Sequence, residues 1–185
     1  MSSRLRIALI PFGEVNPTLL TWLEEDLCGI FTADIEVYPA MQLGPKHFVK
    51  DRGQYLADGL LAEFSSIARA PGTSLLGVTE ADLFSPGMNF VFGIANSGRA
   101  LISSYRLHPE FFGLEPNPKV YRRRILTEAV HELGHALGLP HCEYPGCVMY
   151  FSNWIGDTDR KGPGFCFRCA RTLERLVVTG DNDPG

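Results

Sequence analysis

The segment HELGHALGLPH, residues 131 to 141, constrains this chain more than any other because it places three histidines at set offsets. His131 and His135 are four residues apart, so on a helix their side chains emerge from the same face, one turn apart. Gly138 can end that helix, since glycine accepts the left-handed backbone conformation, and His141 can then return as a third ligand. Three histidines leave one position of a tetrahedral zinc open, which is typical of a catalytic site.

Glu132 lies between the two helical histidines. It is turned by about 100° from His131 around the helix axis, too far to be a natural third ligand but near enough to reach a water held by the metal. Zinc lowers the pKa of such a water toward about 7, and Glu132 can take the proton and pass it to a leaving amine. The HExxH pattern alone arises by accident in charged helices. The full HExxHxxGxxH pattern is a far more specific signal, because it also requires a glycine and a third histidine at fixed offsets. The segment therefore predicts a hydrolase that uses a zinc-activated water, with Glu132 as general base and acid.

Four of the five cysteines lie in or after this segment and predict a second zinc site. Cys142 and Cys147 are five residues apart, and Cys166 and Cys169 form a C-x-x-C pair, a spacing by which structural zinc is usually held. Neighbouring side chains of an extended segment point to opposite sides, so His141 can face the catalytic zinc while Cys142 faces the other ion. A closed four-cysteine site would hold the loop that places His141. We therefore expect two zinc ions per chain, one catalytic and one structural.

The pattern alone leaves other uses of these cysteines open. Two disulfides would require an oxidising compartment, and the N-terminal segment indicates none. A redox C-x-x-C would use Cys166 and Cys169 but leave the other pair unexplained, and buried free cysteines would not need paired spacing. The fifth cysteine, Cys28, is expected to be a small apolar residue within a helix, and His47 and His108 are expected to be surface residues that bind no metal.

Hydrophobic periodicity predicts a chain that alternates strands and helices, an α/β (α+β) fold. Asn117 can cap the helix that carries the histidines, and Pro118 suits its first turn. Past Gly138 the composition changes to a segment rich in glycine, proline and cysteine, so we expect two lobes, 1–138 and 139–185, within a single catalytic domain. The expected strands are 5–13, 34–41, 74–79, 89–96 and 99–107, and the expected helices are 16–31, 53–69, 118–138 and 169–179.

Composition and charge limit the class of protein. With 185 residues, 45% of them hydrophobic, the chain can bury a real core. Its formal net charge of −4 shows no excess of positive charge for a phosphate backbone, so we expect no nucleic-acid partner. The apolar run near the N-terminus stops at Pro11, too early for a signal peptide or a membrane span. We expect a cytoplasmic monomer without a membrane partner.

The motifs taken together resemble those of the archaemetzincins, a branch of the metzincin zinc peptidases marked by four cysteines in addition to the three histidines. The resemblance rests on HELGHALGLPHC, on CVM and CFRC after it, and on LGVTEADLFSPGMNFVFGIA at 76–95, and it extends from about Leu75 to Cys169. It implies a two-lobed catalytic domain with a mixed, mostly parallel sheet, a backing helix, an active-site helix and a small C-terminal lobe that ends in a helix. It also implies that Met149 forms the Met-turn beneath the catalytic zinc. A peptide or protein substrate would extend along a sheet edge, for which NFVFGIANSGRAL is the candidate region.

Some features of the family do not transfer to this sequence. Certain metzincins use a tyrosine two residues past the methionine as an extra ligand, but Phe151 occupies that place here and Tyr150 stands one residue short. The sequence does not indicate the physiological substrate. It also does not indicate whether the enzyme trims peptides from an end or cuts them internally. The alternative to a peptidase is a zinc-stabilised module that captures a peptide or partner without cutting it, although Glu132 favours the enzyme. The run Arg122, Arg123, Arg124 is expected to be a solvated face, with recognition of an acidic group or C-terminal carboxylate as the alternative.

Overall fold

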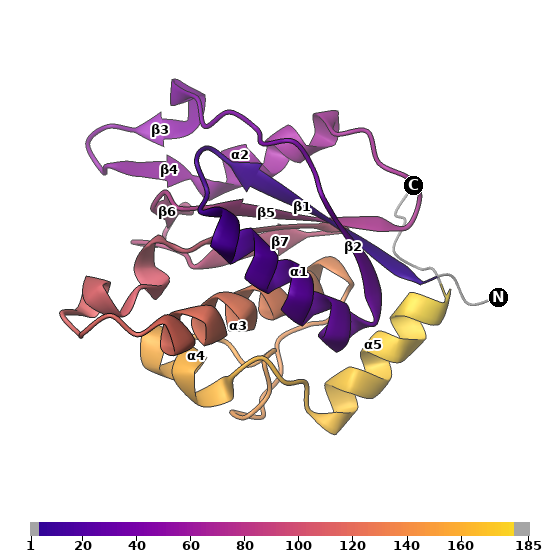
Figure 1. The fold of residues 1–185 in the computed structure, drawn as a ribbon. Coiled ribbons are helices and arrows are strands. Elements are labelled where there is room, and N and C mark those ends of the chain that lie inside the picture. Colours follow the sequence, from indigo (N-terminus) through magenta and orange to yellow (C-terminus); the bar gives the residue numbers. More distant parts are fainter. Residues whose placement is uncertain (1–3, 180–185) are drawn as a thin grey trace.

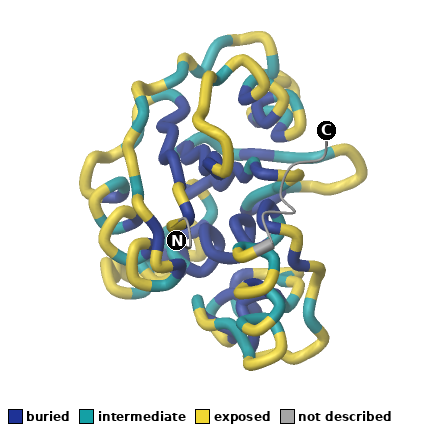
Figure 2. The backbone as a smooth tube through the Cα atoms, turned by 90° about the vertical axis from the view of Figure 1, so that its right-hand side faces the viewer, coloured by how far each residue is buried: buried dark blue, intermediate teal, exposed yellow. Residues whose placement is uncertain are grey.

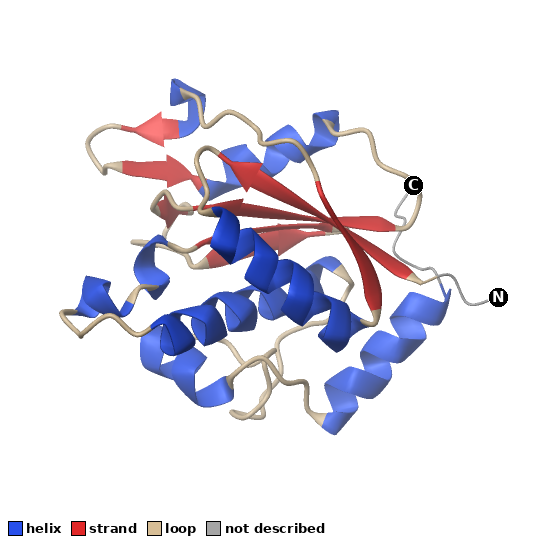
Figure 3. Ribbon diagram, in the orientation of Figure 1, coloured by secondary structure: helices blue, strands red, loops and turns tan. Residues whose placement is uncertain are grey.

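A five-stranded sheet forms the centre of the protein, which we describe from a computed structural model over residues 4–179 (Figures 1 and 3). β1 pairs in parallel with β2 and with β5, and β5 pairs in parallel with β8. β7 lies at one edge and runs antiparallel to β8. The sheet is therefore mixed and mostly parallel, as predicted. Its strands, in spatial order, are β2 (Ala33–Val37), β1 (Leu5–Phe12), β5 (Thr73–Thr79), β8 (Arg99–Ser103) and β7 (Gly93–Asn96).

Helices cover both faces of this sheet (Figure 1). α1 (Pro17–Phe31) and α3 (Pro118–Ala136) lie on one face, and α2 (Ala57–Glu63) lies on the other. Successive side chains of a strand point to opposite faces, so β1 supplies Ile7 and Leu9 to the core beneath α1 and α3, and Ala8 and Ile10 to the core beneath α2. The central strands are accordingly buried on both sides (Figure 2).

Both long helices begin where local sequence rules place them. The side-chain oxygen of Asn16 accepts a hydrogen bond from the backbone N–H of Thr18 at 2.9 Å, and that of Asn117 accepts one from Val120 at 3.2 Å. Each cap is followed by a proline at the first helical position, where no N–H donor is needed. These contacts set the start of α3 and hence the register of its histidines.

Four segments differ from the sequence-based expectation, and one of them is the strand expected at 34–41, which ends at Val37 as β2. The helix expected at 53–69 is replaced over its first residues by strand β4 (Gln54–Leu56), which pairs with β3 (Phe48–Val49) and with β6 (Leu83–Phe84) in a second, three-stranded sheet. Long-range pairing therefore overrides the local helical periodicity. The strand expected at 89–96 is limited to β7, and the strand expected at 99–107 ends at Ser103, before a 3-10 turn. Elements that the sequence did not indicate are the 3-10 helices η1 (Pro45–His47), η2 (Phe64–Ser66), η3 (Tyr105–Leu107) and η4 (Pro109–Phe112), and α4 (Ile155–Lys161).

The chain beyond α3 packs against the underside of that helix (Figure 1). It contains α4 and the final helix α5 (Phe167–Thr179), joined by irregular segments. One core cluster contains residues from both sides of position 138, among them Leu133, Met149 and Leu173. The division into lobes at that position stays a prediction. No helix within residues 4–179 is long and apolar enough to cross a membrane.

Candidate active site

Three histidines converge at the C-terminal end of α3. Each of His131, His135 and His141 offers a ring nitrogen, and these atoms lie within 4.8 Å of one another. The Nε2 atoms of His131 and His135 are 3.2 Å apart. Two nitrogens bound to one tetrahedral zinc at the usual distance of about 2.0–2.1 Å would lie ~3.3 Å apart, so the observed spacing fits a single zinc ion.

Backbone carbonyls fix the orientation of two of these rings. Nδ1 of His131 lies 2.7 Å from the carbonyl oxygen of Val148, and Nδ1 of His135 lies 2.8 Å from that of Leu139. A carbonyl can only accept a hydrogen bond, so each Nδ1 carries the proton and each Nε2 presents a free lone pair. Such outer contacts orient the histidines that bind metals.

The histidines are also held in the neutral form that can coordinate a metal. Burial, together with the nearby Lys161 ammonium, lowers the pKa of His131 from 6.5 to about 2. Burial likewise lowers the pKa of His135 and His141. Because only the unprotonated ring donates a lone pair, this electrostatic environment favours metal ligation.

Glu132 carries a buried carboxylate and lines the same cavity as the three histidines. Its side chain lies against Gly93 of β7, where an added Cβ would come within 2.6 Å of Cγ and 2.9 Å of Oε1 of Glu132. Burial raises the pKa of Glu132 well above its ordinary value, and the Glu128 carboxylate raises it further. Within residues 4–179, Glu132 has neither a hydrogen-bond partner nor an ion-pair partner. A buried carboxylate without a protein partner is rare, so the partner is expected to be what enters the cavity.

Two glycines determine how α3 meets the chain beneath it. A Cβ at Gly134 would clash with the sulfur of Met149, so the glycine lets this fully buried methionine lie directly under the helix. Gly138 has φ of +98°, a conformation that side chains rarely adopt, and the chain turns there after α3 ends at Ala136. The backbone N–H of Cys142 then donates to the carbonyl of Met149 at 2.9 Å, which joins the two arms of the loop.

Behind His131 lies a buried charged network that the sequence did not indicate. Lys161 of α4 donates to the carbonyl of Tyr150 at 2.9 Å and lies 4.0 Å from the carboxylate of Glu128, which also accepts from the hydroxyl of Thr158 at 2.8 Å. Nδ1 of His131 is 3.3 Å from the Lys161 ammonium, but its proton is already donated to a carbonyl, so this is an approach of two donors. Since Glu128 and Lys161 are both buried, each depends on the other for its charge.

The four cysteines after α3 form a second cluster. The sulfurs of Cys142, Cys147, Cys166 and Cys169 lie within 4.8 Å of one another, and those of Cys142 and Cys166 are 3.9 Å apart. Sulfurs bound to one tetrahedral zinc at about 2.3 Å would lie ~3.8 Å apart. A disulfide would instead require about 2.05 Å, and all four thiols are free. The four-thiol arrangement thus fits structural zinc better than disulfides or a redox pair.

Unequal pKa values within this cluster follow from its surroundings. The pKa of Cys166 falls to about 7, chiefly because its sulfur accepts a hydrogen bond from the backbone N–H of Cys169. Burial raises the pKa of Cys147 and of Cys169. Cys166 therefore loses its proton before Cys147 and Cys169, and a cation would be needed to hold those two deprotonated.

The three arginines of the run beside the site all contact neighbouring helices, and they differ in exposure: Arg123 is exposed, Arg122 is half-buried and Arg124 is buried. Arg122 pairs with Asp26 of α1 at 2.8 Å, and the buried Arg124 makes two hydrogen bonds to Asp159 of α4 at 2.7 and 2.8 Å. Arg123 donates to the carbonyl of Asp159. The three side chains therefore tie α3 to its neighbouring helices, and the expectation of a solvated face holds for the exposed Arg123 but not for the buried Arg124.

The remaining histidines and cysteine lie outside both clusters. His47 contacts Glu63 at 2.8 Å, His108 stacks on Tyr121, and Cys28 is exposed on α1. Cys28 was expected to be a small apolar residue, and its thiol instead faces solvent. The histidine cluster opens into a cavity of about 460 Å³ between α3 and β7, lined by Gly93, Glu132 and all three histidines.

Comparisons with known proteins agree with this architecture. A model of peptidase family M54 matches residues 44–175. The archaemetzincin of Pyrococcus furiosus is 42% identical, over 94% of this chain and 95% of that protein, and the archaemetzincin of Methanocaldococcus jannaschii is 40% identical, over 92% and 93%. The crystal structure of archaemetzincin from Methanopyrus kandleri matches with a TM-score of 0.83 and 34% identity, over 94% of this chain and 96% of that one. A zinc-dependent peptidase from Methanocorpusculum labreanum matches with a TM-score of 0.80 and 29% identity, over 90% and 99%.

These similarities define the class of protein as a zinc metallopeptidase. The chain belongs to peptidase family M54, and the family resemblance drawn from its histidine and cysteine motifs is confirmed.

Proposed function

We propose that this protein hydrolyses peptide bonds at the cavity between α3 and β7, with one zinc ion held by His131, His135 and His141. The observation that carries the proposal is the unpartnered carboxylate of Glu132, buried beside three neutral histidines. A purely structural metal site has no use for such a group. General-base catalysis, by contrast, requires a carboxylate within reach of the attacking water.

The cysteine cluster is proposed to hold a second zinc ion with a structural role. Cys142 is adjacent to His141 in the chain, and its N–H is bonded to Met149. The four sulfurs therefore anchor both arms of the loop that carries the third histidine. Closed four-cysteine sites contribute folding free energy in this way.

In the proposed reaction, zinc when bound supplies a Lewis acid at the histidine cluster. Glu132 takes a proton from the attacking water and later gives it to the leaving amine nitrogen. The raised pKa of its buried carboxyl suits the second of these steps, because the protonated form persists until the amine departs. The free edge of β7 offers backbone N–H and C=O groups to an extended substrate, which would lie as an added strand over Glu132.

The test is a mass-spectrometric digest of a mixed peptide library by zinc-loaded protein. Wild type is expected to cut peptides, whereas Glu132→Gln should retain its zinc and lose about 10²- to 10⁴-fold in kcat, since it cannot accept the proton. Glu24→Gln, an exposed change on α1, is the matched control and should cut at the wild-type rate.

Equal turnover in Glu132→Gln would refute the assigned role. Absence of cleavage by wild type, with two zinc ions measured per chain, would instead favour a binding module of the same fold.

A further inference from the structure

Lys161, the last residue of α4, carries a buried ammonium group that the proposed reaction does not use. Burying an ammonium group costs free energy unless hydrogen bonds and opposite charges compensate for it. Three polar groups lie near it: the carbonyl of Tyr150 at 2.9 Å, Nδ1 of His131 at 3.3 Å and the carboxylate of Glu128 at 4.0 Å. A charge held at this cost directly behind a candidate metal ligand indicates a role at that ligand.

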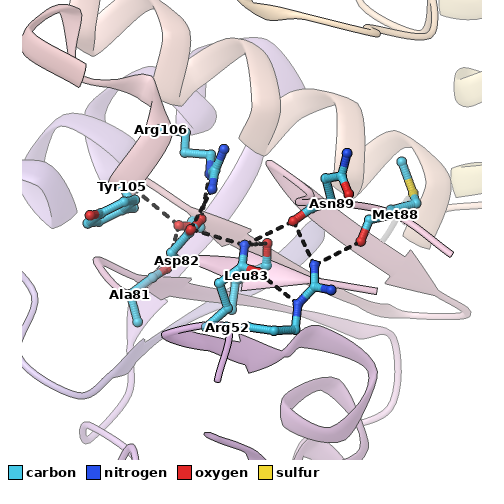
Figure 4. Close-up of polar contacts among 10 residues, drawn as sticks. Arg52, Ala81, Asp82, Leu83, Met88, Asn89, Tyr105 and Arg106 are labelled. Atoms are coloured by element: carbon cyan, nitrogen blue, oxygen red, sulfur yellow. Dashed lines mark hydrogen bonds and ion pairs between the residues drawn. The ribbon is translucent and has the colours of Figure 1, made fainter. Parts of the chain in front are cut away.

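Neutralisation of Glu128 does not account for the placement of this ammonium group. The two charges are 4.0 Å apart, beyond hydrogen-bonding distance, and the Glu128 carboxylate accepts its hydrogen bond from Thr158 instead. The partly buried pair of Asp82 and Arg106 shows the contrasting geometry, because its charges meet through two hydrogen bonds of 2.7 Å (Figure 4). Buried ion pairs are also weak evidence for stability. The donor of Lys161 is therefore directed elsewhere than at its counter-charge.

The carbonyl that Lys161 contacts ends a tight turn, and this turn carries the outer contact of His131. The turn runs from Cys147 to Tyr150, whose N–H donates to the Cys147 carbonyl at 2.9 Å, and Val148 lies within it. The Val148 carbonyl oxygen lies 2.7 Å from Nδ1 of His131. The direction of this carbonyl, and with it the orientation of the ring, depends on how the turn is held.

Lys161 holds the end of the turn that backbone hydrogen bonds leave to a side chain. The N–H of Val148 and the carbonyl of Met149 are bonded to backbone groups of neighbouring segments. The carbonyl of Tyr150 accepts its hydrogen bond from Lys161 instead. α4 is itself fixed against α3 by the ion pair of Arg124. The lysine thus links the docked helix to the turn that contacts the histidine.

We propose that Lys161 is a positioning residue for His131. It holds the turn so that the Val148 carbonyl stays on Nδ1 of the ring, and Nε2 then faces the other two histidines. Groups that fix the unbound nitrogen of a histidine set its tautomer and orientation, and their loss commonly lowers metal affinity about 10- to 100-fold. This inference rests on the proposed zinc site, because it assigns a supporting group to one of its ligands.

The ring N–H signals of isotope-labelled histidines, measured by NMR, report the proposed contact directly. In wild type, the Nδ1 proton of His131 should exchange slowly with water, because it is buried and hydrogen-bonded. Lys161→Met, similar in length but without the donor, should speed this exchange at least about tenfold and weaken zinc binding at the histidine site about 10- to 100-fold in competition with a chelator. His135 is the internal reference, since the Leu139 carbonyl holds its ring, and its proton should keep the wild-type rate.

Glu128→Gln separates positioning from neutralisation of charge. This variant removes the counter-charge, but the Lys161 amine can still donate to the Tyr150 carbonyl, so the exchange rate at His131 and the zinc affinity should match wild type. In Lys161→Met/Glu128→Gln both buried charges are absent, and exchange at His131 should stay fast. Lys119→Met, the same substitution at an exposed site on α3, should match wild type in both measurements.

Exchange at His131 as slow in Lys161→Met as in wild type would overturn the proposal. So would equal acceleration at His131 and His135, which indicates general destabilisation, or recovery in the double variant, which indicates neutralisation of Glu128. If the Lys161 variants do not fold, Glu128→Gln decides: a protected His131 proton supports positioning, and loss of protection overturns it. Exchange is read with and without zinc and needs no substrate, so failure of the proposed peptidase function would leave this result standing.

Discussion

At the scale of single residues, Gly93 decides where the Glu132 carboxylate lies. A methyl group at position 93 would meet Glu132 and also the carbonyl oxygen of Leu101 at 2.8 Å, so β7 and the carboxylate must move apart. We expect Gly93→Ala to lower kcat by at least about 100-fold, since small displacements of reacting groups have effects of this size. The three atoms nearest to this methyl group belong to Glu132 and Leu101 and not to a histidine, so zinc content should stay at the wild-type value.

Steady-state kinetics and metal analysis on the same sample test this prediction. Gly29→Ala is the control, because it lies in α1 with nothing within 4 Å of the added carbon, and it should leave kcat unaltered. Full activity in Gly93→Ala would show that the close approach is not needed.

At the scale of elements, the loop between α3 and α4 is held by the cysteine cluster. Cys147→Ser and Cys169→Ser should each reduce the zinc content from two ions per chain to one. We expect kcat/KM to fall by about 10- to 100-fold, the usual loss when groups that support metal ligands are removed. Thermal unfolding should also occur at a lower temperature, because structural zinc adds folding free energy.

Cys28→Ser provides the matched control for that experiment. Its thiol is exposed on α1, outside the cluster, so zinc content and unfolding temperature should equal those of wild type. Two zinc ions retained in both cluster variants would contradict the structural role.

At the scale of the whole molecule, a buried tyrosine where α3 contacts α1 makes the free energy of unfolding depend on pH. Tyr121 of α3 stacks on His108 and meets Trp22 of α1 edge to face. Burial raises the pKa of Tyr121 from 10.0 to about 12. The folded protein therefore keeps a proton that the unfolded chain releases, and this contribution, fully present below pH 10, should disappear as pH rises through 12.

Urea unfolding of wild type and Tyr121→Phe between pH 8 and 12.5 measures this contribution as a difference. The free energy of unfolding of wild type should fall more steeply above pH 10 than that of the variant. Parallel curves would show that Tyr121 does not titrate differently in the two states.

Patterns that depend on neighbouring residues could be predicted well. Asn117 caps its helix as the sequence indicates, and Asn16 caps the helix expected at 16–31. Prediction failed where contacts between distant segments decide the structure. Gln54 starts a strand because the next residue, Tyr55, pairs with Leu83 and because the Gln54 side chain donates to Asp82 and Asn89, and no local pattern contains that information.

The same distinction applies to the candidate site. Helical spacing and a glycine stop sufficed to group the histidines, and short cysteine spacings sufficed to group the thiols, because both depend on backbone geometry over a few residues. A glycine within an apolar strand was a signal for the close approach at Gly93, whereas nothing in the sequence pointed to Lys161 behind His131. The sequence by itself determined the ligand groups and the helix that presents them. Only the tertiary structure decided the surroundings of Glu132, the pairing of the arginine run and the placement of Lys161, because burial and charge pairing depend on which distant segments the fold brings into contact.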